Sequence, residues 1–177
     1  MAPEPFLGDV QRSPVSHHIL SVLVENKAGV LSRVAGLFTR RGFNIYSLAV
    51  APADDSQRFS RITIVIDAES APLEQIVAQL DKLINVVEIR DLAPREAIER
   101  ELLLATVEVT ESDRGELLDR VARAGAAIVD FSASSATVSM SGTPAAVDAF
   151  ERSLAERYPS PQIQRTGRVA LPRLSHD

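Results

Sequence analysis

The spacing of apolar residues predicts strands and helices in alternation along the chain. An apolar and partly β-branched run of strand length covers residues 18–24, and a polar loop follows it. The next apolar positions recur at helical spacing and form one stripe of an amphipathic helix: Val30, Leu31, Val34, Leu37 and Phe38. Gly42 supplies the left-handed residue that closes such a helix. Two strands then follow, over residues 44–51 and 59–66.

A second helix and a fourth strand complete this first unit. Ser70 is suited to cap the helix, and Pro72 is tolerated in its first turn. The apolar positions that follow keep the helical period: Leu73, Ile76, Val77, Leu80, Leu83 and Ile84. Residues 86–92 form a short strand. The resulting order, β-α-β-β-α-β, predicts a four-stranded antiparallel sheet with both helices on one face.

The second half of the chain repeats this order. Strands are expected over four ranges: 102–109, 126–131, 136–140 and 163–171. Ser112 or Asp113 caps the first helix of this half, and Gly125 ends it. Thr143 caps the second helix, with Pro144 at its first position.

The predicted fold class is therefore α+β, with two tandem ferredoxin-like βαββαβ units. Residues 1–17 contain three prolines and no apolar period, so they are expected to form a flexible tail. The first unit spans residues 18–93 and the second spans 102–173. Residues 94–101, which are rich in charge, are expected to be the linker between them.

Composition excludes several classes of function. The chain of 177 residues carries 24 acidic and 19 basic side chains, a net charge of −5, which argues against electrostatic binding of nucleic acid. It contains no cysteine, so thiolate catalysis, disulfides and cysteine-ligated zinc are excluded. No apolar run is long enough to cross a membrane, and the first residues do not resemble a signal peptide. We therefore expect a cytoplasmic protein with no membrane partner.

Nothing in the sequence assembles a catalytic or metal site. The three histidines, His17, His18 and His176, lie outside or at the edge of the predicted core elements. The chain has neither a zinc-binding histidine motif nor a glycine-rich phosphate loop. Asp54 and Asp55 fall in a turn, where aspartate hydrogen-bonds its own backbone. The chain is therefore expected to be non-catalytic, with no metal ligands.

One loop could bind a small ligand. Residues 25–32 join the first strand to the first helix, so Gly29 lies where backbone N–H groups lack partners and the helix dipole is positive. A carboxylate can dock at such a place. Asn26 and Asn44 could offer amide groups to the charged ends of an amino acid. The alternative is that these glycine and asparagine residues only shape turns.

These residues also carry a resemblance to a known family. The segment Asn26–Val34 (NKAGVLSRV), with Arg41–Ile45 (RGFNI) and Ser47-Leu48, resembles the ACT domain, a small fold that binds amino acids. Over nearly the whole chain beyond the tail, the order of segments resembles the small regulatory subunit of acetolactate synthase. Further matching segments are Ser60-Arg-Ile-Thr63, Glu99-Arg-Glu-Leu102 and Arg165-Thr-Gly167.

The resemblance implies a partner and an effector. The partner would be the large catalytic subunit, which would hold thiamine diphosphate, magnesium and FAD, while this chain would bind no cofactor. In such families the small subunit activates the large one and confers feedback inhibition, commonly by valine, in branched-chain amino acid biosynthesis. ACT domains of two copies pair side by side, which implies a homodimer.

The resemblance also implies the residues that bind the effector. One protomer would contribute the loop and the start of the first helix: Asn26, Ala28, Gly29, Val30, Leu31 and Ser32, with Ser32 supporting the loop. The neighbouring protomer would contribute Asn44 and Ile45. Two alternatives stay open, namely a free-standing ACT-domain sensor that regulates another enzyme or a transcription factor, and a small α+β enzyme.

Overall fold

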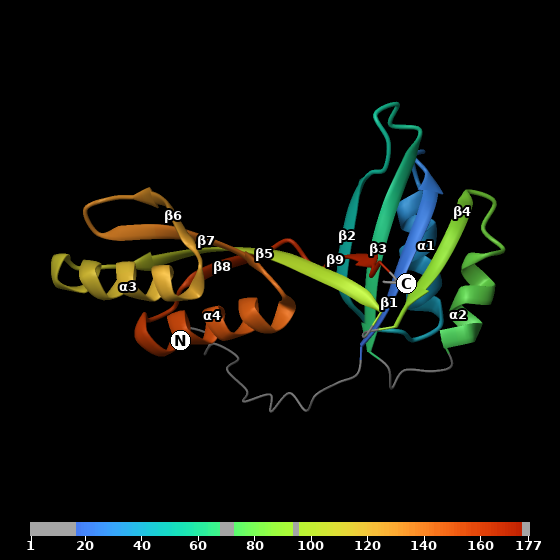
Figure 1. The fold of residues 1–177 in the computed structure, drawn as a ribbon. Helices are drawn as coiled ribbons and strands as arrows, with labels where there is room; N and C mark the ends of the chain where they lie inside the picture. Colours follow the sequence, from blue (N-terminus) through green and yellow to red (C-terminus); the bar gives the residue numbers. More distant parts are fainter. Residues whose placement is uncertain (1–16, 68–72, 94–95, 175–177) are drawn as a thin grey trace, which may run out of the picture.

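The structure is a computed structural model that describes residues 17–67, 73–93 and 96–174. Two α+β units follow each other along the chain, and one long strand reaches from the second unit to the first (Figure 1). The predicted fold class, with two ferredoxin-like units, is confirmed.

The first unit has the predicted order of elements. It consists of β1 (His17–Glu25), α1 (Val30–Arg40), β2 (Ile45–Pro52), β3 (Phe59–Asp67), α2 (Leu73–Leu80) and β4 (Val86–Leu92). Its four strands form one sheet in the order β2-β3-β1-β4, with antiparallel neighbours. Strand β2 is therefore an edge strand. Both helices pack on one face of the sheet, because alternate strand residues such as Leu20, Val22, Ile62 and Ile64 form one core with the helix stripes.

The second helix of this unit is shorter than its apolar pattern predicts. Helix α2 ends at Leu80, and the N–H of Leu83 turns back to donate to the Leu80 carbonyl at 2.9 Å. Ile84 is 90% exposed, so its place in the predicted helix was wrong. The expected cap Ser70 and Pro72 lie outside the described residues.

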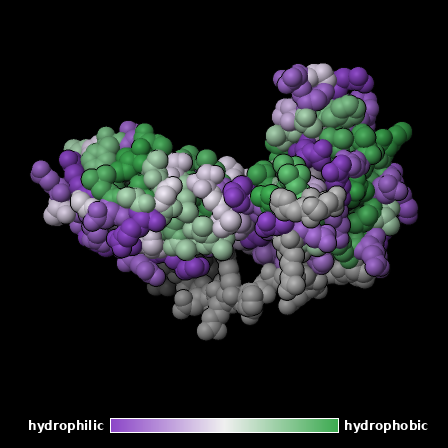
Figure 2. Space-filling view, viewed as in Figure 1, coloured by the Kyte–Doolittle hydropathy of each residue, from purple (hydrophilic) through white to green (hydrophobic). Residues whose placement is uncertain are grey.

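The second unit repeats the order around its own core. It consists of β5 (Ala97–Glu108), α3 (Arg114–Ala124), β6 (Ala127–Phe131), β7 (Ser135–Gly142), α4 (Pro144–Arg157) and β8 (Gln162–Arg165), with strand order β6-β7-β5-β8. A 3₁₀ turn, η2 (Glu111–Asp113), precedes α3. Figure 2 shows apolar side chains gathered over the β6–β7 side of this unit, where Val129 and Phe131 are exposed.

The helix ends of the second unit test the predicted caps. Gly125 has a φ of 65° and ends α3, and the Thr143 hydroxyl accepts a hydrogen bond from the N–H of Ala146 at 3.3 Å, so both predictions are confirmed. Asp113 stands at the N-cap of α3 but makes no cap there. Its carboxylate accepts instead from the N–H of Thr110 at 3.1 Å, in a capping box around the 3₁₀ turn.

The predicted linker and the predicted last strand were both wrong. Strand β5 begins at Ala97, so most of the expected linker is strand. The expected single strand over 163–171 is divided into β8 and β9 (Val169–Pro172). The first residues of β5 pair with β9, whereas later ones pair with β7 and β8. The charges of Glu99 and Glu101 suggested a solvated surface, but both carboxylates are paired with arginines of the second unit.

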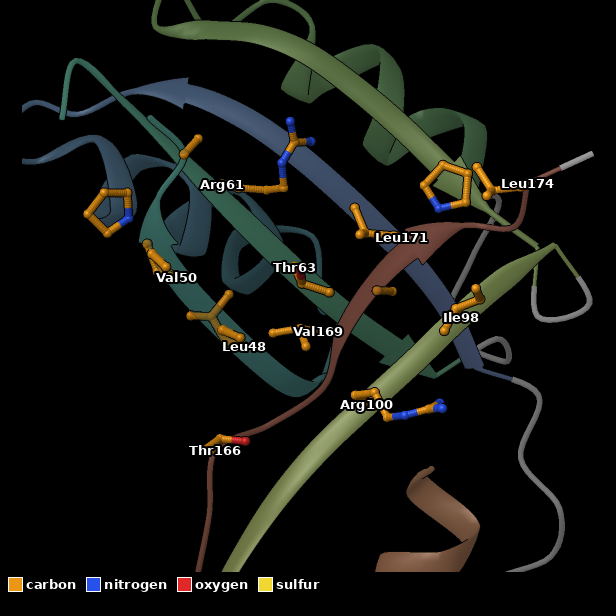
Figure 3. A pocket seen from close by; sticks show the side chains of 16 residues that line it. Leu48, Val50, Arg61, Thr63, Ile98, Arg100, Thr166, Val169, Leu171 and Leu174 are labelled. Carbon is orange, nitrogen blue, oxygen red and sulfur yellow. The ribbon is translucent and has the colours of Figure 1, made fainter. Parts of the chain in front are cut away.

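Strands β5 and β9 cover part of the first sheet on the face that its helices leave open. Ala97 and Ala170 pack there against Ile19, Val65 and Leu92 in a separate small core. Beside this contact lies a groove of about 990 Å³ between the edge of the first sheet and β9 (Figure 3). Its walls are largely apolar, with Leu48, Val169 and Leu171 among the lining residues, and no predicted effector residue lines it.

Candidate functional site

The loop before α1 has a backbone that only glycine adopts without strain. Gly29 has a φ of 82° and stands at the N-cap of α1. A Cβ built there would meet nothing within 4 Å, so the backbone conformation, rather than lack of space, selects glycine. The space in front of Gly29 is therefore open to a ligand.

The start of α1 is electrostatically suited to an anion. No side chain caps this helix, and its first turn contains no acidic residue among those described. The first N–H groups of a helix have no intrahelical partner and lie at the positive end of its dipole. Leu31 and Ser32 are exposed in this turn. This end of α1 can accept a carboxylate without competition from the chain's own acids.

Asn26 has a structural role in the loop. Its side-chain N–H₂ donates to the Gln57 carbonyl at 2.8 Å, and its backbone N–H donates to the Arg58 carbonyl at 2.8 Å. These bonds tie the β1–α1 loop to the β2–β3 loop. The Asn26 Nδ2 group is thus already engaged within the chain, as the turn-shaping alternative expects.

Polar contacts fix the other side of the same loop. Lys27 donates to the Glu25 carboxylate at 3.0 Å, and Arg33 donates to the Asn85 side chain at 2.9 Å. The hydrogen bond from Lys27, followed by one from Asn85, holds the pKa of Glu25 below its ordinary value. Glu25 therefore stays ionised and paired with Lys27 and Asn85.

The structure brings together only part of the predicted site. Residues 26–32 share one loop and helix start, whereas Asn44 and Ile45 lie beyond the other end of α1. A helix of this length separates its ends by about 16 Å, at 1.5 Å for each of its 11 residues. Within one chain the two groups are therefore apart, and that different protomers supply them stays a prediction.

Val50 is a candidate that the sequence reading missed. It pairs with Ile62, whose side chain faces the helices, yet 44% of Val50 is exposed because β2 is an edge strand. Leu31, at the start of α1, is 41% exposed. The alternation of apolar residues within 44–51 was the sequence signal that could have indicated Val50. That Val50 lies on an edge strand follows only from the order of strands in the sheet.

Comparison with known proteins identifies the family. Residues 20–88 match the model of the AHAS small subunit-like ACT domain, and residues 100–174 match that of the small subunit of acetolactate synthase. The chain belongs to the acetolactate synthase small-subunit family. A small subunit implies a separate large subunit that carries out catalysis, so the family and the kind of partner predicted from the sequence are confirmed.

Close relatives span nearly the same length as this small subunit. The acetolactate synthase small subunit of Mycolicibacterium smegmatis is 46% identical over 88% of this chain and 91% of its own. That of Haemophilus influenzae is 44% identical over 88% of this chain and 94% of its own. The crystal structure of the Thermotoga maritima small subunit superposes with a TM-score of 0.82, at 34% identity, over 90% of this chain and 99% of that one.

The described residues of the small subunit hold neither a metal-ion cluster nor a membrane-spanning helix. Residues 17–67, 73–93 and 96–174 contain no group of three or more histidine, aspartate or glutamate side chains that could hold a metal ion. No helix in those ranges is long and apolar enough to span a bilayer. The arrangement at α1 offers N–H donors and apolar surface, which are suited to binding a small ligand with a carboxylate.

Proposed function

We propose that this small subunit activates the thiamine-diphosphate-dependent large subunit and makes it sensitive to feedback inhibition by valine. The observation that carries the proposal is the uncapped start of α1, where Gly29 leaves space for a ligand carboxylate. The cofactors thiamine diphosphate, magnesium and FAD belong to the large subunit in this proposal. The small subunit supplies the effector site and the surface that contacts its partner.

The effector site needs two copies of the chain. Strand β2 is the edge of the first sheet, so a second copy can add its own β2 there. Antiparallel pairing of the two strands places the start of one β2 beside the end of the other. Asn44 of one protomer then lies near the Gly29 end of α1 in its partner. This geometry supports a homodimer with two equivalent sites.

The groups available match a branched-chain amino acid. The start of α1 binds the carboxylate, the Asn44 amide oxygen accepts from the ammonium group, and Leu31 with Val50 covers the side chain. Burial of an isopropyl group contributes roughly 1.5–3 kcal/mol, and each charged hydrogen bond contributes about 1.5–3 kcal/mol. After the cost of association, the expected Kd lies between roughly millimolar and micromolar.

An activity assay of the large subunit tests this function directly. Addition of the small subunit should raise the rate of acetolactate formation, and valine should then lower that rate. The large subunit alone should respond weakly to valine, which makes it the control. A large subunit whose rate and valine response are unchanged by this chain would contradict the proposal. Valine binding without such an effect would favour the free-standing sensor.

Mixing two variants tests whether the site is shared between protomers. Asn44→Ala should weaken valine binding about tenfold or more, because one charge-assisted hydrogen bond is worth about 1.5–3 kcal/mol. Gly29→Asp should also weaken binding. A heterodimer of the two variants contains one site with both residues intact and one with neither. Calorimetry of the heterodimer should therefore show wild-type affinity for valine at half of its sites. If each site lay within one chain, neither site of the heterodimer would bind valine with wild-type affinity.

A further inference from the structure

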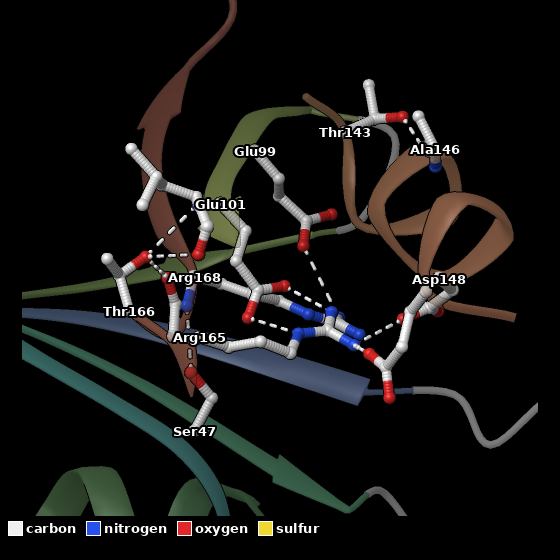
Figure 4. A network of polar contacts seen from close by, with 12 residues as sticks. Ser47, Glu99, Glu101, Thr143, Ala146, Asp148, Arg165, Thr166 and Arg168 are labelled. Carbon is white, nitrogen blue, oxygen red and sulfur yellow. Dashed lines mark hydrogen bonds and ion pairs between the residues drawn. The ribbon is translucent and has the colours of Figure 1, made fainter. Parts of the chain in front are cut away.

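Four residues join the second unit to strand β2 of the first, and we call them the seam: Tyr46, Ser47, Gly167 and Arg168. The backbone N–H of Arg168 donates to the Ser47 hydroxyl at 2.8 Å (Figure 4). The Arg168 guanidinium lies 5.1 Å from the centre of the Tyr46 ring, within the range of a cation–π contact. The seam thus holds the β8–β9 turn against the start of β2.

Gly167 allows the two backbones to approach closely at the seam. It has a φ of 80°, and a Cβ built on it would lie 2.7 Å from the Ser47 hydroxyl oxygen and 3.5 Å from the Leu48 carbonyl oxygen. A side chain at this position would force β2 and the turn apart. Gly167 is therefore selected both by its backbone conformation and by the contact with β2.

A β-bulge in β2 directs the side chains of Tyr46 and Ser47 toward the second unit. Ile45 pairs with Ile66, but Ser47 pairs with Val65, so Tyr46 is the extra residue. Ile45 and Leu48 pack against the core under the helices, whereas Tyr46 packs on the opposite face of the sheet, where Ser47 meets Arg168. The bulge begins at Ile45 and directly follows Asn44, and both residues belong to the proposed effector site. A shift of β2 at that site therefore reaches the seam within one or two residues.

Arg168 of the seam and Arg165 beside it differ in how many partners hold their guanidinium groups. Arg165 pairs with three carboxylates, those of Glu101, Asp148 and Glu151, at distances of 2.5 to 2.8 Å. Arg168 is only 8% exposed, yet the one ion pair found for it among the described residues is with Glu99 at 3.4 Å. Its Nε is buried without a hydrogen-bond partner in the same part of the chain. A buried donor without a partner costs stability, so an arrangement that gives this Nε an acceptor would offset part of that cost.

Space for such a change lies beside the seam. A cleft of about 410 Å³ lies beside the contact between the start of β2 and the β8–β9 turn, and its lining includes Tyr46, Ser47, Glu101 and Arg165. Arg165 anchors one wall through its three carboxylates, which fixes the end of β8. The turn that follows β8 can therefore move relative to β2 while the second unit keeps its fold.

We propose that the seam carries the effector signal from the first unit to the second. Valine held between α1 of one protomer and β2 of the other stabilises one arrangement of Tyr46 and Ser47 over another. The hydrogen bond from the Arg168 N–H to the Ser47 hydroxyl is then strengthened or weakened with that arrangement. An effector shifts such an equilibrium only by its different affinity for the two arrangements. This inference rests on the proposed function, because it requires an effector that binds at β2.

Two variants break the seam without touching the effector loop. Arg168→Ala removes the guanidinium from Tyr46 and Glu99, and Ser47→Ala removes the hydroxyl that accepts from the Arg168 N–H. Arg152→Ala is the matched control, because it removes an exposed arginine from α4 of the same unit. Each variant is measured for valine binding by calorimetry, for activation of the large subunit and for inhibition by valine.

The seam variants should separate binding from inhibition. We expect valine binding to change less than about threefold while the valine concentration for half inhibition rises about fivefold or more, since coupling between sites typically spans 5- to 150-fold. Activation without valine should persist. In the wild type, valine should also alter hydrogen exchange at the Arg168 amide. The Arg152→Ala protein should be inhibited as the wild type is.

Two different failures can be told apart. If valine inhibits the wild type and both seam variants equally, and leaves exchange at the Arg168 amide unchanged, the seam does not carry the signal. If valine neither binds to nor inhibits the wild type, the proposed function fails and this inference fails with it. Ser47→Ala keeps the test valid if Arg168→Ala does not fold, because it removes only one hydroxyl.

Discussion

Replacement of Gly29 by aspartate is expected to abolish feedback inhibition by valine while the large subunit is still activated. The new carboxylate would sit at the uncapped start of α1, where the carboxylate of the effector docks in the proposed site. The effector would lose its charged hydrogen bonds, worth about 1.5–3 kcal/mol each, and would meet a like charge. We expect valine affinity to fall about 100-fold or more, since each 1.4 kcal/mol is tenfold.

Two control variants separate charge from backbone effects. Gly29→Asn has nearly the same shape as the aspartate but no charge, and asparagine tolerates a positive φ better than most residues. It should retain more valine inhibition than Gly29→Asp. Gly115→Asp makes the same change at the start of α3, where an added Cβ also meets nothing within 4 Å, and should leave inhibition unchanged. Full inhibition of the Gly29→Asp complex would remove the start of α1 from the site.

Replacement of Arg165 by methionine should strongly destabilise the second unit. Arg165 binds the Glu101 carboxylate through two nitrogens, at 2.9 and 2.5 Å, and the Glu101 side chain is only 5% exposed. The hydrogen bond to Glu101, and then that to Asp148, raises the pKa of Arg165, so the arginine remains charged. Methionine would leave a buried carboxylate without its partner, at a cost of about 3–5 kcal/mol. Urea unfolding measures this loss.

A second arginine in the same unit provides the comparison. Arg157 also pairs with two carboxylates, those of Asp113 and Glu116, but its side chain is more exposed. Arg157→Met should therefore cost about 1 kcal/mol or less, as exposed ion pairs do. The double variant Arg165→Met, Glu101→Gln should recover part of the lost stability because the buried charge is gone. Equal losses for Arg157→Met and Arg165→Met would show that burial of Glu101 does not set the cost.

Local periodicity was enough to predict the fold of each unit. Helix α1 and the core-facing residues of β3 follow patterns that depend only on neighbours in sequence, and these elements were predicted within a residue or so. The end of α2 and the start of β5 were missed because they depend on distant contacts. Glu99 and Glu101 looked like a solvated linker, since nothing local shows that Arg168 and Arg165 lie opposite them.

The candidate site was predictable for the loop but not for its surroundings. Gly29 stands at the start of α1, where the sequence places it, but its positive φ does not follow from that position, because residues at a helix N-cap usually have extended backbone. The bond from Asn26 to Gln57 could not be read from the sequence, because the two residues belong to different loops. The contact between Ser47 and Arg168 joins residues 121 positions apart and depends on a bulge that has no sequence signature here.

Strand β5 contributes to both units, so the amino-terminal unit cannot be produced alone without exposing apolar side chains. Its first residues, together with β9, shield Ile19, Val65 and Leu92 from water, although both strands belong to the carboxyl-terminal half of the chain. A fragment ending at residue 93 would leave these three apolar side chains uncovered, on a sheet that already has an unpaired edge at β2. Such a piece would be prone to self-association. Experiments on effector binding therefore belong to the intact polypeptide rather than to an excised amino-terminal half.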